Sequence, residues 1–128
     1  MAIEYILDAS AVLAFLHRET GCEKVERLLD RSTITAVNLS EVLTKLILSG
    51  ASFAEAVNVA KALQLPIIAF DEELAVSGAN LCRLAGTHGL SVGDRACLVA
   101  GRERRLTAIT ADRSWASLNA GVSVRLIR

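Results

Sequence analysis

Apolar residues in this chain follow two alternating patterns. Short runs rich in β-forming apolar residues predict buried strands, and the stretches between them carry apolar residues at helical spacing. The predicted strands are residues 3–7, 33–37, 66–70, 106–110 and 122–127. The predicted helices are residues 9–16, 21–30, 38–50, 52–64, about 71–84, 91–104 and 112–118. Strands alternating with helices predict an α/β layer sandwich with a mainly parallel sheet.

Several predicted helices open on a polar residue followed three positions later by an acid. In such a capping box the first side chain and the acid each bond the other residue's backbone N–H, so the pattern marks a helix start. Asp71 is a further candidate helix start, directly after the third predicted strand. The candidate boxes are Asn38 with Glu41, Ser52 with Glu55, and Ser91 with Asp94.

Length and composition indicate one folded domain. The 128 residues predict a single domain spanning 1–128, and the 52% hydrophobic content argues against disorder. The formal net charge is zero, so any nucleic-acid contact has to use a local patch rather than a globally basic surface.

Cysteine spacing and the length of the apolar runs predict the cellular compartment. The three cysteines form no C-x-x-C motif, which is typical of free thiols in a reducing cytosol. The N-terminal apolar run is broken by Glu4 and Asp8 and has no preceding basic segment, so no signal peptide is predicted. No run approaches the roughly 18 apolar residues of a membrane helix. We therefore expect a soluble, cytoplasmic protein without a membrane partner.

Four acids stand at or near the first turns of predicted helices: Asp8, Glu41, Asp94 and Asp112. Strand-to-helix connections of a parallel sheet lie at its carboxyl edge, where ligands bind. One interpretation is structural, because an acid at a helix N-terminus stabilises the helix by about 0.3–1 kcal/mol. Asp71 obeys the same pattern and is not expected to be a ligand. The other interpretation is a metal site, and spacing alone leaves both open.

Chemistry narrows this choice. Converging carboxylates repel one another unless a cation neutralises them, and Mg²⁺ or Mn²⁺ prefers oxygen ligands. Such ions can bind a phosphodiester and activate water for its hydrolysis. His17 and His88 are isolated in the sequence, and neither a nucleophile-elbow motif nor a phosphate-binding loop occurs.

Four short segments in order resemble the PIN domain, specifically the VapC-type toxin ribonuclease of bacterial toxin–antitoxin pairs. The resemblance covers essentially the whole chain. It implies a PIN-like three-layer sandwich with a five-stranded sheet in the order 3-2-1-4-5. It also implies a Mg²⁺- or Mn²⁺-dependent endoribonuclease. The segments are Leu7-Asp8-Ala9-Ser10-Ala11, Asn38-Leu39-Ser40-Glu41-Val42, the run from Ser91 to Leu98, and Thr110-Ala111-Asp112.

The resemblance also implies roles for individual residues. Asp8 and Asp94 would be the principal metal ligands, and Glu41 and Asp112 would complete the catalytic site directly or through water. The hydroxyls of Ser10 and Thr110 would support bound water or phosphate.

The implied partners are an RNA substrate such as tRNA or rRNA, a cognate antitoxin protein, and a second copy of the chain in a homodimer. The antitoxin is expected on the helices of residues 21–30 and 38–64. Lys45, Arg95 and Arg113 are candidates for phosphate contact, and solvated helix charges are an equal alternative. Arg102, Arg104 and Arg105 close a helix and are expected at the opposite edge of the sheet.

Other functions remain as alternatives. A non-catalytic PIN-like binding module is one, although such modules usually lose one or more of the acids. A haloacid-dehalogenase-like phosphatase also places an acid after its first strand, but it needs a second Asp where this chain has Ser10. A receiver domain would need a lysine after the last strand, and Lys61 is the last lysine here.

Overall fold

The computed structural model describes residues 2–84 and 86–128. Its strands pair in parallel into one five-stranded sheet with the order β3-β2-β1-β4-β5, which confirms the order implied by the family resemblance. β1 is therefore central, and β2 and β4 flank it. The strands are β1 (Tyr5–Leu7), β2 (Ser32–Thr35), β3 (Ile67–Ile68), β4 (Thr107–Thr110) and β5 (Val124–Leu126).

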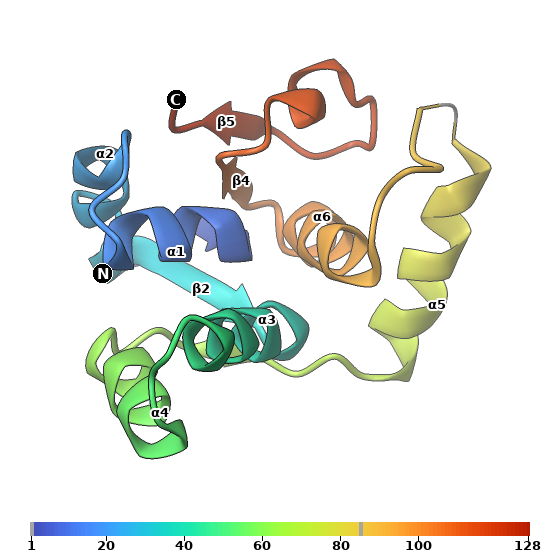
Figure 1. Ribbon diagram of the computed structural model, residues 1–128. Coiled ribbons are helices and arrows are strands. Elements are labelled where there is room, and N and C mark those ends of the chain that lie inside the picture. The colour runs from blue at the N-terminus through green and yellow to red at the C-terminus, as the bar shows by residue number, and fades with distance from the viewer. Residues whose placement is uncertain (1, 85) are drawn as a thin grey trace.

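Helices cover both faces of the sheet, as Figure 1 shows. One side carries α1 (Ala9–Leu16), α2 (Cys22–Glu26), α3 (Ala36–Leu48) and α4 (Phe53–Ala62). The other carries α5 (Glu72–Asn80) and α6 (Val92–Arg104). Short 3-10 turns are η1 (Leu29–Arg31), η2 (Leu81–Arg83) and η3 (Arg113–Ser117). None of the helices in the described part of the chain has the length and apolar character needed to cross a bilayer.

The central strands are apolar on both faces because each face meets a different core. Leu7 and Ile109 pack with α1 to α4, whereas Ile6 and Ala108 pack with α5, α6 and the buried Trp115 of η3. Successive side chains of a strand point to opposite faces, so one continuous apolar run fills two cores. The sheet is thereby held between two helical layers, and its carboxyl edge stays open to helix N-termini.

Some elements are shorter than predicted. The third strand spans only Ile67–Ile68 instead of 66–70, because it is the margin of the sheet and pairs with β2 alone. The predicted helix 21–30 divides into α2 and η1, and the helix predicted to reach residue 84 ends at Asn80 and continues as η2.

The predicted start of α3 at Asn38 is wrong. The helix begins at Ala36, and its N-cap is Thr35, whose hydroxyl accepts a hydrogen bond from the Asn38 backbone N–H at 3.0 Å. The Asn38 side chain instead donates to Glu41 Oε1 at 2.8 Å. The cap comes earlier because Thr35 ends β2 and leads straight into the helix. The other two capping boxes, Ser52 with Glu55 and Ser91 with Asp94, are confirmed.

Candidate acidic active site

Three of the four predicted acids converge where the central strands end. Asp8 directly follows β1, Glu41 lies near the start of α3, and Asp94 lies in the first turn of α6. α3 packs against both α1 and α6, which brings these three helix starts together. Glu41 and Asp94 both act electrostatically on Asp8, and all three carboxylates raise the pKa of the buried Cys97 thiol, although burial is the main cause there.

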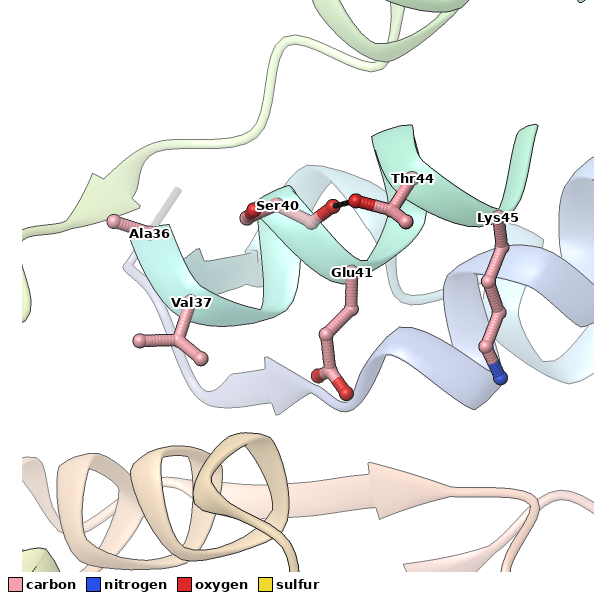
Figure 2. Close-up of a pocket in the computed structure, with 6 residues that line it drawn as sticks. All are labelled: Ala36, Val37, Ser40, Glu41, Thr44 and Lys45. Atoms are coloured by element: carbon pink, nitrogen blue, oxygen red, sulfur yellow. Dashed lines mark hydrogen bonds between the residues drawn. The ribbon is translucent and has the colours of Figure 1, made fainter. Parts of the chain in front are cut away.

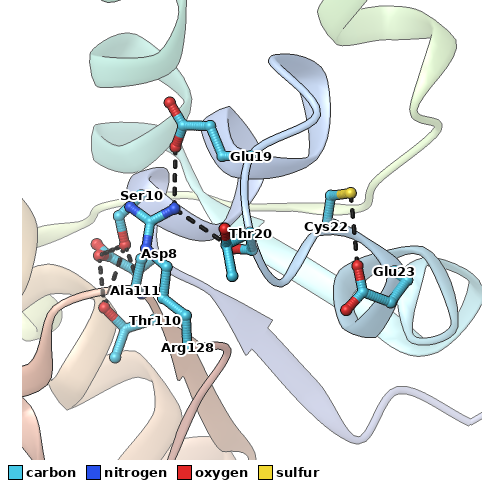
Figure 3. Close-up of polar contacts among 9 residues, drawn as sticks. All are labelled: Asp8, Ser10, Glu19, Thr20, Cys22, Glu23, Thr110, Ala111 and Arg128. Carbon is cyan, nitrogen blue, oxygen red and sulfur yellow. Dashed lines mark hydrogen bonds and ion pairs between the residues drawn. The ribbon is translucent and has the colours of Figure 1, made fainter.

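Asp8 is the buried member of this group. Its side chain is 5% exposed, and its Oδ2 accepts hydrogen bonds from Ser10 Oγ at 2.6 Å and Thr110 Oγ1 at 3.0 Å (Figure 3). Burial raises the pKa of Asp8 from 3.8 to about 6. The two hydroxyl bonds oppose this rise, and the negative charges of Asp94 and Glu41 add to it.

Ser10 and Thr110 tie Asp8 to the end of the neighbouring strand. The Ser10 hydroxyl also accepts from the Ala111 backbone N–H at 2.9 Å, and Thr110 accepts from the Asp112 N–H at 3.0 Å. The two hydroxyl oxygens lie 3.2 Å apart. Both hydroxyls therefore orient Asp8, while their support of water or phosphate stays a prediction.

Glu41 points from α3 toward the junction of β1 and α1 (Figure 2). It borders an open pocket whose lining also includes Val37 and Lys45. Asn38 Nδ2 donates to Glu41 Oε1 at 2.8 Å and to the Gly93 carbonyl of α6 at 3.0 Å. The Glu41 carboxylate is thus held against the first turn of α6.

Asp94 and Asp112 each receive hydrogen bonds at the start of their own helix. Asp94 Oδ2 accepts from the Ser91 N–H at 3.0 Å. Asp112 Oδ1 accepts from the Ser114 N–H at 3.0 Å and from its hydroxyl at 2.7 Å. Asp112 is linked to Asp8 through the Thr110 hydroxyl, which accepts from the Asp112 backbone N–H and donates to Asp8 Oδ2. It lies at the end of β4, next to Asp8 in the order of the sheet.

The donor set suits a hard divalent cation. Within residues 2–84 and 86–128, no three His, Cys, Asp or Glu side chains are already grouped tightly enough to form a metal-ligand set. In the same residues, each of the four carboxylates receives its hydrogen bonds on a single oxygen, which leaves the other oxygen as a possible ligand atom. The bonded oxygens are Oδ2 of Asp8, Oε1 of Glu41, Oδ2 of Asp94 and Oδ1 of Asp112. Mg²⁺ and Mn²⁺ take oxygen ligands of this kind, and a cation would offset both the burial that chiefly raises the Asp8 pKa and the added repulsion from Asp94 and Glu41.

The arginines singled out in the sequence lie at two opposite edges of the sheet. Arg95 follows Asp94, but its guanidinium donates to the Cys82 sulfur at 2.7 Å and to the Ser91 carbonyl at 3.4 Å. Arg104 lies with Thr33 and Pro66, at the edge where the strands begin. The arginines that close α6 therefore lie away from the acids, as expected.

Two residues of the site were not singled out for it by the sequence. Asn38 was predicted only as a helix cap, and Gly93 was given no role of its own within the run from Ser91 to Leu98. Gly93 lies inside α6, immediately before Asp94, and Asn38 is fully buried. The sequence signal was their place in the segments that resemble the PIN domain, with Asn38 three positions before Glu41 and Gly93 directly before Asp94.

Several solved structures of other proteins share the fold of this chain. The DNA-bound VapBC complex from Salmonella typhimurium has a chain with a TM-score of 0.75 and 13% identity, covering 98% of this chain and 99% of that one. VapBC2 from Rickettsia felis, bound to a promoter DNA fragment, gives 0.73 and 15%, covering 97% and 98%. VapBC-5 from Mycobacterium tuberculosis, a member of a toxin–antitoxin family, gives 0.66 and 25%, covering 100% and 99%.

Among curated proteins, the search found no match. The family model described as the PIN domain matches residues 5–120, which is most of the chain. This chain therefore belongs to the PIN domain family.

Proposed function

We propose that this PIN domain is a Mg²⁺- or Mn²⁺-dependent endoribonuclease, the toxin of a type II toxin–antitoxin pair acting in the cytoplasm. The convergence of Asp8, Glu41 and Asp94 at the carboxyl edge of the sheet is the observation that carries this proposal. Membership of the PIN family removes the haloacid-dehalogenase-like phosphatase as an alternative. The substrate is RNA, with structured RNA such as tRNA or rRNA as the first candidates.

In the proposed mechanism, the residues of the chain would bind the metal ion and orient its carboxylate ligands. When bound, Mg²⁺ or Mn²⁺ would supply the Lewis-acid chemistry for hydrolysis of a phosphodiester, which would leave a 5′-phosphate and a 3′-hydroxyl. Asp8 and Asp94 would be its principal ligands, and Glu41 and Asp112 would complete the acidic site. Ser10 and Thr110 hold Asp8 in one orientation, because both hydroxyls donate to the same carboxylate oxygen.

Cleavage of RNA by the purified protein tests this function. With Mg²⁺ or Mn²⁺ the wild-type protein should cleave total RNA, and excess EDTA should stop the reaction. Asp8→Asn and Asp94→Asn should each abolish cleavage, because each variant replaces a negatively charged ligand with a neutral amide of the same shape. Circular dichroism should show that both variants remain folded.

Asp71→Asn is the matched control, since Asp71 also begins a helix but follows the outermost strand. It should cleave RNA as the wild type does. Full activity in both Asp8→Asn and Asp94→Asn would show that the metal site is wrongly assigned. A wild-type protein that binds RNA without cleaving it would favour the non-catalytic binding module.

The proposed protein partner is a cognate antitoxin, because the similar structures include toxin–antitoxin complexes. α3 and α4 form an apolar groove lined by Leu39, Leu43, Val57 and Leu65, and Phe53 at the start of α4 is 72% exposed. An amphipathic helix is a suitable occupant of such a groove. We place the antitoxin here and propose that the toxin itself is a homodimer.

Co-expression tests the partner. The product of an adjacent small gene should copurify with the chain in a stable complex and suppress its ribonuclease activity. Size-exclusion chromatography with light scattering should give a dimer for the chain alone. A monomer that is not toxic to cells and captures no neighbouring gene product would contradict this assignment.

A further inference from the structure

Asn38 connects two helices at the acidic site. Its side chain has 0% exposure, and its Oδ1 accepts a hydrogen bond from Thr35 Oγ1 at 2.6 Å. Its Nδ2 donates both to Glu41 Oε1 and to the Gly93 carbonyl. The amide thus uses both N–H groups, one on the carboxylate of α3 and one on the backbone of α6. Its donation to Glu41 is charge-assisted and therefore stronger than a neutral hydrogen bond.

Gly93 makes room for the same carboxylate. A Cβ atom added to Gly93 would lie 2.6 Å from Glu41 Oε2 and closer still to Cδ and Oε1. Gly93 sits within the first turn of α6 and does not have a positive φ, so its backbone does not require glycine. Glycine lowers helix stability relative to alanine. Its presence here is explained by the position of the Glu41 carboxylate.

We propose that Asn38 and Gly93 are positioning residues for metal binding, which together hold the Glu41 carboxylate against the first turn of α6 beside Asp94. Asn38 fixes the carboxylate by donating to it, and Gly93 leaves the space that it occupies. This inference rests on the proposed metal-dependent function. It assigns neither residue to contact with substrate or metal, since both act through Glu41.

Urea unfolding in EDTA tests the geometry without any metal. Gly93→Ala should be measured in the wild type and in the Glu41→Ala background. When the Glu41→Ala substitution removes the carboxylate, the new methyl group has room, and the helical preference for alanine should raise the urea midpoint. With Glu41 present the rise should be smaller or replaced by a loss, because the carboxylate must leave Asn38.

The matched control is Gly78→Ala in α5. There an added Cβ has its nearest neighbour at 3.9 Å, and it should raise the midpoint equally in both backgrounds. An equal effect of Gly93→Ala in both backgrounds would overturn the steric part of the proposal.

Mn²⁺ affinity, measured by calorimetry, tests the role of the arrangement. Gly93→Ala and Asn38→Leu, which keeps a similar shape but lacks the amide, should each weaken Mn²⁺ binding by about tenfold or more, as loss of a supporting partner of a metal ligand typically does. Gly78→Ala should bind as the wild type does. In the Glu41→Ala background, Gly93→Ala should cause no further weakening, because the residue through which it acts is gone.

Wild-type affinity in both Gly93→Ala and Asn38→Leu would overturn the positioning role, as would an undiminished effect of Gly93→Ala without Glu41. A wild-type protein that binds no Mn²⁺ would refute the proposed function, and the role toward metal with it. The urea measurements would then still decide whether Gly93 leaves the space that the Glu41 carboxylate occupies.

Discussion

Asp8 is ionised at an electrostatic cost in the folded protein. Burial raises its pKa from 3.8 to about 6, and the charges of Asp94 and Glu41 contribute to that rise. A rise of about two pKa units corresponds to about 3 kcal/mol of preference for the protonated form in the folded state. At neutral pH the metal-free protein is folded with an ionised Asp8 that the fold disfavours, and a bound cation would relieve this cost.

The raised pKa predicts how stability depends on pH without metal. The folded state binds the Asp8 proton more tightly than the unfolded chain, so this contribution is fully present below about pH 4 and is lost as the pH rises through 6. In EDTA, the unfolding free energy of the wild type relative to Asp8→Asn should therefore fall by about 2 kcal/mol between pH 4 and 7. Urea denaturation at several pH values measures it.

Saturating Mn²⁺ provides the control for this pH dependence. Metal binds the ionised carboxylate, so in Mn²⁺ the wild type should gain stability relative to Asp8→Asn as the pH rises over the same range. Parallel pH profiles for the two proteins in EDTA would show that Asp8 ionises normally in the folded state.

At the scale of elements, local sequence patterns predicted whether a segment forms a helix or a strand better than they predicted where it begins and ends. The capping boxes at Ser52 and Ser91 were predicted because each involves residues only three apart. At Asn38 and Glu41 the same spacing was misleading, because the strand ends in Thr35 and this residue caps the helix first. The length of β3 depends on having one neighbouring strand instead of two, which no local pattern encodes.

The corrected start of α3 predicts that Thr35 matters more than an exposed cap. Its hydroxyl accepts from the Asn38 N–H and donates to Asn38 Oδ1, and the side chain is fully buried. Thr35→Val should lower the free energy of unfolding by more than the ~1 kcal/mol typical of a lost N-cap. The substitution also leaves the buried side-chain Oδ1 of Asn38 without its hydrogen-bond donor. Thermal unfolding in EDTA measures the loss.

Ser52→Ala is the comparison, since Ser52 caps α4 through exposed hydrogen bonds. It should cost about 1 kcal/mol. A smaller loss for Thr35→Val than for Ser52→Ala would contradict the assigned role of Thr35.

At the scale of the molecule, strand order decides which acids meet. The sequence could predict Asp8, Glu41, Asp94 and Asp112 as candidates because each follows a strand or opens a helix. It could not predict the contact of Asn38 with Gly93, because these residues lie 55 positions apart and meet only through the packing of α3 on α6. The hydrogen bonds of the Asp112 carboxylate likewise depend on its turn, where the Ser114 N–H and hydroxyl both donate to Oδ1.

The same strand order separates ligand acids from capping acids. Asp71 follows β3 at the margin of the sheet and caps α5 by accepting from the Leu74 N–H at 3.0 Å. Asp94 opens α6, whose first turn faces Asp8 and Glu41. Metal that binds only the folded state raises stability by mass action. The wild type should therefore melt at a higher temperature in Mn²⁺ than in EDTA.

The Asp71→Asn and Asp94→Asn variants should differ in this metal-induced rise in melting temperature. Asp71→Asn should lose little stability in either condition, because Asn still caps the helix and only the charge at its N-terminus is removed, and it should keep the metal-induced rise in melting temperature. Asp94→Asn should lose most of that rise. In EDTA the stability that Asp94→Asn loses through its weakened capping box should be partly regained, because the substitution removes a charge that repels Asp8. Differential scanning calorimetry of the three proteins in Mn²⁺ and in EDTA measures both effects. If Asp71→Asn removes the metal response and Asp94→Asn keeps it, the metal lies at the margin of the sheet and not at its centre.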